Sequence, residues 1–206
     1  NDEILELVKE RGSTDNLLHP TRILIKFKNE DIKSTISDVI GSSTLYTASL
    51  QLTAAEPKNL ISTLNINAWA VSQSWDEGTG RYSNLPASSN GASWKYRNNT
   101  TIATEWITSS FETASTGSIS SSQLTQGGGV WYTGSEFKAT QQFLVGDSLD
   151  TNLNITDIVG KWSASLFANQ THPTGIANNG LILKKPELIE VNTSSSFGEL
   201  QYFSVD

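Results

Sequence analysis

TRILIKF, residues 21–27, alternates apolar and polar side chains along its length. Its apolar members, Ile23, Ile25 and Phe27, fall on one side of an extended chain, and its two cations fall on the other. This period of two predicts a β-strand with one buried face.

The same alternation recurs along the chain, in ASLQL (48–52), LNINAWAV (64–71), ATQQFLV (139–145) and GLILK (180–184). Aromatic and apolar residues near the C-terminal end indicate a last strand, at Phe197, Leu200 and Tyr202–Phe203. Glycine-containing turn signals separate these segments, at 77–80, 88–91, 127–129 and 178–180. Many short strands with such turns predict an all-β fold, an antiparallel two-sheet β-sandwich of jelly-roll-like form.

Two segments carry a helical period, so one or two short helices are expected. DIKSTISDVI (31–40) follows Asn29 as a candidate cap, and ITDIVGKW (155–162) begins at Asn154 or Thr156 as a cap. The expected core residues of the sandwich are Ile23, Ile25, Phe27, Leu50, Leu52, Ile66, Val159 and Trp162.

The domain plan expected from the sequence is simple. Residues 1–20 form an N-terminal strand or extension, and residues 21–206 form a single β-sandwich domain. Long loops are expected at about 78–104 and at about 109–130, where Ser, Thr and Gly dominate.

Composition excludes several classes of function. The net charge of -7 and the lack of a basic stripe argue against nucleic acid as a partner. The chain has no cysteine, which excludes thiolate metal sites, disulfides and cysteine nucleophiles. No apolar run reaches membrane-spanning length, so no membrane insertion is expected.

Catalytic groups do not form a recognisable pattern. His19 and His172 are the two histidines, and each precedes a proline. Asp76 and Glu77 are adjacent and would face opposite sides of a strand, which does not suit paired acid catalysis. We therefore expect no catalytic residues and no enzyme activity.

A segment rich in side-chain oxygens, DSLDTNLNITD (147–157), is a weak candidate for structural calcium. Its candidate ligands are Asp147, Asp150 and Asp157. The spacing differs from the helix–loop–helix calcium pattern, and a solvated loop with a helix cap is the favoured interpretation. No other cofactor is expected.

Aromatic residues provide the candidates for ligand contact. In SWKYRNN (93–99), Trp94 and Tyr96 alternate with Lys95 and Arg97, a pattern that suits an acidic sugar or an ordinary strand. Trp69 lies between two alanines and is expected on the outer face. The candidate glycan or partner contacts are Trp94, Tyr96, Arg97 and Trp69.

The chain resembles the DNRLRE-type β-sandwich modules, also called disaggregatase-repeat-like modules. The resemblance runs from about Thr21 onward through RILIKF, ASLQL, WDEGTG (75–80), GASW (91–94), LNITDIVGKW, ANNGLILKK and the closing Phe203, Ser204 and Asp206. The chain departs from the family pattern in its charged N-terminal stretch, in a Ser/Thr/Gly insertion before GGGVWYT, and in Asp206 where Glu is usual.

The resemblance implies a role for the segment VSQSWDEGTG (71–80). It would be a structural corner in which Trp75 packs and pins the loop and Gly78 and Gly80 supply the turn. Glu77 would bond backbone amides or a cation such as Arg81. Ligand contact is the alternative.

The resemblance also implies a function. Modules of this type occur in secreted wall-associated proteins and in virion structural proteins of tailed phages, and SSSFGELQYFSVD (194–206) is most similar to the phage examples. The expectation is a non-catalytic structural module of a virus particle, in a neck, tail, fibre or surface protein, which is oligomeric in its assembly. Its partners would be other structural proteins and a host surface glycan. The alternative is a carbohydrate-binding module of a secreted or cell-surface protein.

Overall fold

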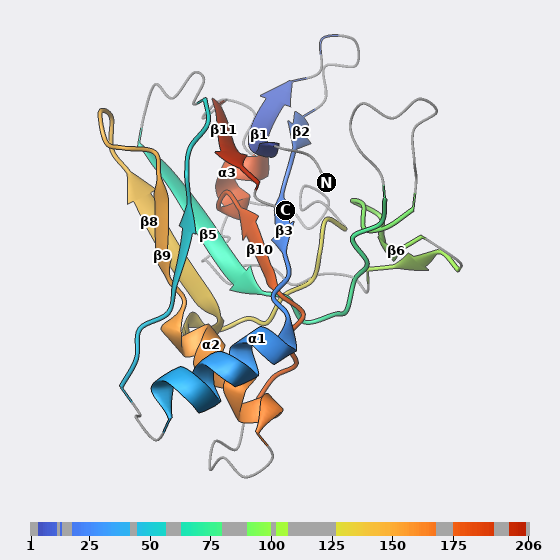
Figure 1. The fold of residues 1–206 in the computed structure, drawn as a ribbon. Coiled ribbons are helices and arrows are strands. Elements are labelled where there is room, and N and C mark those ends of the chain that lie inside the picture. Colours follow the sequence, from blue (N-terminus) through green and yellow to red (C-terminus); the bar gives the residue numbers. More distant parts are fainter. Residues whose placement is uncertain are drawn as a thin grey trace.

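The computed structural model describes ten stretches of the chain: residues 4–11, 13, 18–41, 45–56, 63–79, 90–99, 102–106, 127–167, 175–191 and 198–204. Among these residues, strands dominate and short helices flank them (Figure 1). No helix of the described part is long and apolar enough to cross a membrane.

A four-stranded antiparallel sheet forms the centre of the fold. Its order is β3 (Ile23–Ile25), β10 (Leu181–Lys184), β5 (Leu64–Ala70) and β8 (Lys138–Phe143). In this register, Leu181 pairs with Ile25 on one side and with Ala70 on the other. The segment TRILIKF thus supplies an edge strand, and its partner comes from the far end of the chain.

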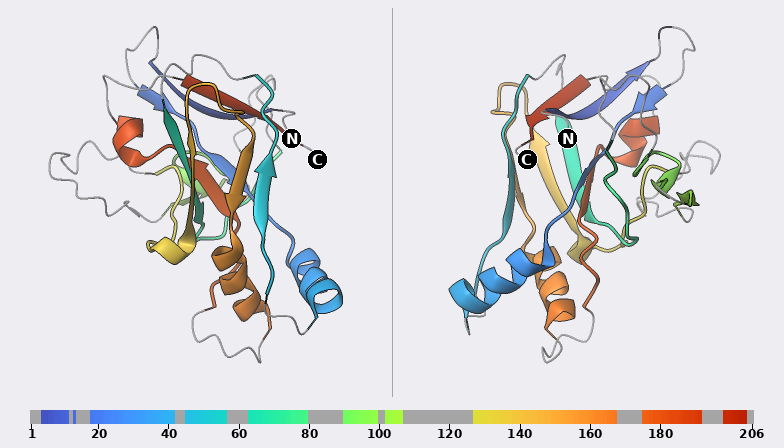
Figure 2. Two further views of the ribbon diagram at one scale, coloured as in Figure 1. Left: turned by 90° about the vertical axis from the view of Figure 1, so that its left-hand side faces the viewer. Right: turned by 45° about the vertical axis from the view of Figure 1, so that its right-hand side comes forward.

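Three smaller antiparallel sheets surround the central one (Figures 1 and 2). The strand β4 (Ser49–Leu52) pairs with β9 (Thr151–Asn154). The strand β1 (Ile4–Arg11) lies between β11 (Gly198–Phe203) and β2 (Leu18–Pro20), and β6 (Tyr96–Asn98) pairs with β7 (Thr104–Glu105). The predicted all-β, sandwich-like fold is confirmed.

One apolar core joins the central sheet to the β4–β9 pair, to the β1–β11 pair and to a helix. Residues from all four contribute, including Ile66, Leu153, Leu200 and Trp162. Of the expected core residues, Ile23, Leu50, Ile66 and Trp162 are buried, and Ile25, Phe27, Leu52 and Val159 are partly buried and packed against the core.

The helices of residues 29–40 and 156–166 lie at one end of the sheets (Figure 2). Helix α1 (Asn29–Ser34) continues into a π-helical segment η1 (Thr35–Ile40), and α2 (Thr156–Leu166) packs beside it. A single 3-10 turn, η2 (Ser135–Phe137), precedes β8, and α3 (Glu187–Val191) follows β10. The segment that forms α3 carries no clear helical signal in the sequence.

The expected helix caps are wrong for both helices. Asn29 is the first residue of α1 and not its cap, which is Lys28. The Asn29 Oδ1 atom instead accepts a hydrogen bond from Asn178 Nδ2 at 3.0 Å, which ties α1 to the segment that precedes β10. The cap of α2 is Ile155, although Asn154 Oδ1 accepts a hydrogen bond from the amide of Thr156, the first residue of the helix, at 3.0 Å.

A second apolar cluster covers the other face of the central sheet. It contains four buried tryptophans and two buried aliphatic residues, which are Trp69, Trp75, Trp106, Trp131, Val71 and Ile182. Because successive side chains on a strand face opposite ways, Trp69 and Ile182 lie on the face opposite Ala68 and Leu181. The central sheet is therefore buried on both faces.

Candidate functional site

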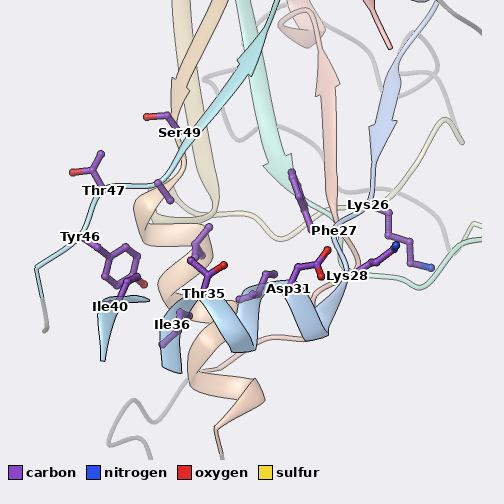
Figure 3. Close-up of a pocket in the computed structure, with 13 residues that line it drawn as sticks. Lys26, Phe27, Lys28, Asp31, Thr35, Ile36, Ile40, Tyr46, Thr47 and Ser49 are labelled. Carbon is purple, nitrogen blue, oxygen red and sulfur yellow. The ribbon is translucent and has the colours of Figure 1, made fainter. Parts of the chain in front are cut away.

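A pocket of about 610 Å³ opens between the α1–η1 segment and the start of β4, beside α2 (Figure 3). We call it the flank pocket. Its walls are mostly apolar and include Phe27, Ile32, Ile36, Ile40, Tyr46 and Val159. Its volume lies within the range of small-molecule and side-chain binding sites in proteins.

The helical wall of the flank pocket follows from the sequence. Ile32, Ile36 and Ile40 recur every four residues, which places them along one side of a helix. All three are only partly buried, and neither α1 nor η1 contains a fully buried residue. The apolar stripe is therefore only partly covered by the protein's own core.

Two exposed apolar residues are next in sequence to residues that line the flank pocket. Val39 is 79% exposed and Leu45 is 89% exposed, and each directly precedes a residue that lines the pocket. At the opposite end of the pocket lie Lys26, Lys28 and Asp31, which Figure 3 shows close together beside Phe27. The pocket thus has an apolar body and a charged end.

A second group of residues forms a buried ion cluster that the sequence patterns did not reveal. It lies on the face of the central sheet that carries the four buried tryptophans, which we call the tryptophan face. Arg22 pairs with Glu190 through two contacts, Nε to Oε1 at 3.2 Å and Nη2 to Oε2 at 2.6 Å. Lys184 Nζ lies 3.5 Å from the same Oε2 and 3.9 Å from Glu187 Oε1. All four side chains are almost entirely removed from solvent.

Aromatic rings and a glycine loop cover this cluster. The Arg22 guanidinium lies 4.6 Å from the Trp94 ring centroid and 5.4 Å from that of Trp131, within cation–π range. Its Nη1 atom donates to the carbonyl of Gly128 at 3.0 Å. Alternation in TRILIKF and GLILK placed Arg22 and Lys184 on a polar face, but that pattern could not show that the face is covered.

The predicted contact residues do not form one exposed platform. Trp69 is 5% exposed and packs in the tryptophan cluster at 6.3 Å from Trp131, so its expected placement on an open outer face is wrong. Trp94 is half-buried, and the guanidinium of Arg22 lies over its ring. Both rings take part in the packing that covers the central sheet.

The other two predicted contact residues lie on β6. Tyr96 is half-buried, with Lys95 Nζ at 5.0 Å from its ring, and Lys95 also meets Glu105 at 3.2 Å. The interaction with Tyr96, followed by that with Glu105, raises the pKa of Lys95. Arg97 Nη1 donates to the Ser74 carbonyl at 2.9 Å and to its Oγ at 3.1 Å.

The segment after β5 has the geometry of a tight corner. Trp75 is buried, and its Nε1 donates to the Asn179 carbonyl at 2.7 Å. Gly78 has φ of 78° and lies against the backbone of Asn90 and Gly91. Glu77 is exposed and has no side-chain partner among the described residues, and Gly80 and Arg81 lie outside those residues.

Two of the three calcium candidates accept hydrogen bonds from backbone amides. Asp147 Oδ2 accepts from the Leu144 amide at 2.8 Å, and Asp150 Oδ1 accepts from the Ala54 amide at 2.9 Å. Asp157 is exposed in the first turn of α2. Among the described residues, no group of three or more His, Cys, Asp or Glu side chains is placed to hold a metal ion. Part of the candidate segment, Thr151–Asn154, is the strand β9 and not a loop.

The two histidines are not brought together in the described part of the chain. His19 is exposed on β2. His172 falls outside the described residues, as does most of the predicted loop at 109–130. Comparisons with protein-family models, with curated proteins and with solved structures find no match to this chain.

Proposed function

We propose that the chain is a non-catalytic structural module of a virus particle, which acts by binding neighbouring structural proteins of the same assembly. The flank pocket is the proposed contact surface. The observation that carries this is the combination of a mostly apolar pocket with the exposed side chains of Val39 and Leu45, each next in sequence to a lining residue. Exposed apolar surface is typical of a protein contact site.

The state of the buried carboxylates supports a structural role. Glu190 bonds Arg22 with both oxygens and lies near Lys184, and Glu187 lies near the same lysine. These acids are used to neutralise cations inside the fold. The proposed function therefore rests on contact between chains and not on proton transfer to a substrate.

The experiment compares incorporation of variants into particles. Val39→Asp and Leu45→Asp place charge beside the flank pocket at exposed positions, where we expect the melting temperature to stay within a few degrees of wild type. Particles purified from a culture that supplies each variant should then contain much less of the chain. Leu144→Asp and Val145→Asp are matched controls, because these residues are also exposed and apolar but lie on the turn between β8 and β9.

Two outcomes would contradict the proposal. If purified particles never contain the wild-type chain, the particle assignment is wrong. If the variants beside the flank pocket enter particles as well as the two controls do, the pocket is not the contact surface.

A carbohydrate-binding module is the second candidate, on the observation that Lys95, Tyr96 and Glu105 share the short hairpin β6–β7 at the surface. Tyr96→Ala should abolish binding to an acidic glycan array if this candidate is correct. Phe203→Ala, at a half-exposed aromatic on β11, is the control. Binding by wild type that is lost only with Tyr96→Ala would favour this function over assembly.

A further inference from the structure

A lysine and an asparagine lie directly opposite each other inside the tryptophan face. Lys184 on β10 pairs in register with Asn67 on β5. Residues opposite each other in an antiparallel pair point to the same face, with Cβ atoms about 5 Å apart. Lys184 is 0% exposed and Asn67 is 2% exposed. Burial of both polar side chains is costly unless they interact with their surroundings.

We propose that Lys184 and Asn67 form an intramolecular amide cross-link between β10 and β5 once the chain has folded. The step requires a change of rotamer that moves Nζ away from the Lys185 carbonyl, to which it donates a hydrogen bond at 3.0 Å, and toward the Asn67 amide carbon. The inference is independent of the assembly function.

The surroundings supply the groups that such a step requires. Glu190 Oε2 lies 3.5 Å from Lys184 Nζ and is the closer of the two carboxylates that face it, which makes Glu190 the group placed to accept a proton. The Thr140 hydroxyl donates to Asn67 Oδ1 at 3.0 Å, where negative charge develops when the carbonyl is attacked. Each group therefore faces the atom that it would assist.

The covering layer removes the attacking amine from solvent. The Trp131 ring centroid lies 5.2 Å from Lys184 Nζ, and Trp69 packs against Trp131. Desolvation opposes the charged form of a buried lysine, whereas a ring face and nearby carboxylates favour that form. At the adjacent Lys185, desolvation is the largest effect and lowers the pKa to about 8, assisted by the nearby charge of Lys9.

The reaction balances without an oxidant or a further reactant. Lys184 Nζ begins as an ammonium, gives one proton to the Glu190 carboxylate and attacks Asn67 Cγ as the neutral amine, forming the Nζ–Cγ bond. A second proton then passes from Nζ to Nδ2, the Cγ–Nδ2 bond breaks, and the ammonia that leaves takes the first proton back from Glu190. Overall, a lysine ammonium and an asparagine amide become a secondary amide and an ammonium ion.

The product changes the charge balance of the ion cluster. The step removes the positive charge of Lys184, which lies beside Glu187, while Glu190 keeps both of its bonds to Arg22. It also joins two neighbouring strands of the central sheet that lie far apart in the sequence. A chain without cysteine has no disulfide to do this.

The experiment measures the intact mass of the folded wild-type chain after purification. We expect a mass lower than the sequence mass by one ammonia, about 17 Da. Proteolysis followed by mass spectrometry should then yield a branched peptide that joins the segment containing Asn67 to the segment containing Lys184. Lys184→Arg should restore the full mass, whereas Lys185→Arg, the matched neighbour, should keep the cross-link.

A further variant tests the assisting group. Glu190→Gln should fold, as judged by circular dichroism, but accumulate the cross-linked form at least about tenfold more slowly, in the range expected for loss of a general base. Equal rates would remove Glu190 from the proposal.

The wild-type chain decides the proposal even if the variants fail to fold. A folded wild-type chain with the full sequence mass, unchanged after days of incubation, overturns it. So does a loss of ammonia that maps to the Asn90–Gly91 or Asn179–Gly180 pair, where asparagine can cyclise onto the next amide.

Discussion

Gly78 and Gly91 meet backbone to backbone at the corner that follows β5. A Cβ on Gly78 would lie 2.8 Å from Gly91 Cα, and a Cβ on Gly91 would lie 2.6 Å from Gly78 Cα. Both residues have positive φ, 78° and 91°. The corner therefore depends on glycine at both positions, for conformation and for space.

Gly78→Ala should destabilise the fold by about 2–4 kcal/mol, because a strained φ and a backbone clash add together. Gly41→Ala is the control, since Gly41 has φ of 60° but no described atom within 4 Å of its Cβ position. The free energy of unfolding of the control should fall by only about 1 kcal/mol. Urea denaturation measures this quantity for both variants. Equal losses would show that the close backbone contact at the corner does not add to the cost of Gly78→Ala.

Trp75→Ala should cost about 3–5 kcal/mol, the range for a large aromatic side chain removed from a core. Trp75 is buried in the tryptophan cluster, and its indole N–H bonds the Asn179 carbonyl. Trp75→Phe keeps much of the packing but leaves that carbonyl without its donor. This variant should lower the free energy of unfolding by about 1–3 kcal/mol. A melting midpoint unchanged by Trp75→Ala would contradict the packing role.

Arg22→Ala should destabilise by about 3–5 kcal/mol, because it leaves the buried Glu190 carboxylate without its closest counter-charge. Lys95→Ala breaks the exposed pair with Glu105 and should leave the free energy of unfolding unchanged within error. Chemical denaturation of both variants makes the comparison. A small effect of Arg22→Ala would mean that Lys184 alone neutralises Glu190.

Tyr202 should make stability fall at high pH. Burial raises its pKa from 10.0 to about 12, and its hydroxyl accepts a bond from Thr151 Oγ1 at 2.8 Å. Between these values the unfolded chain loses the phenol proton and the folded chain keeps it, so rising pH favours unfolding. The contribution is fully present below about pH 10 and is lost as pH rises through about 12, up to about 2–3 kcal/mol.

The measurement is the free energy of unfolding of wild type and of Tyr202→Phe at about pH 8 and about pH 11. The variant should show a smaller loss between the two values. Parallel losses would assign the pH dependence to other groups.

Local patterns identified much of the fold in advance. The alternation in TRILIKF and GLILK predicted β3 and β10, and the spacing of Ile32, Ile36 and Ile40 predicted a helix at 31–40, which the structure shows as the α1–η1 segment from Asn29 to Ile40. These signals are local, because side-chain direction repeats every two residues on a strand and about every 3.6 on a helix. The sequence also indicated the corner through its Trp and Gly residues.

Tertiary structure decided what those faces meet. Alternation places Arg22, Trp69 and Lys184 away from the main core, but only the packing of the 127–131 loop and of α3 over the sheet turns that face into a second buried layer. The flank pocket likewise depends on tertiary structure, because its walls come from both the α1–η1 segment and the start of β4. The pairing of Lys184 with Asn67 joins strands separated by more than half of the chain. Sequence periodicity reports which way a side chain points, whereas burial and charge pairing depend on contacts between segments distant in sequence, and no local pattern encodes those contacts.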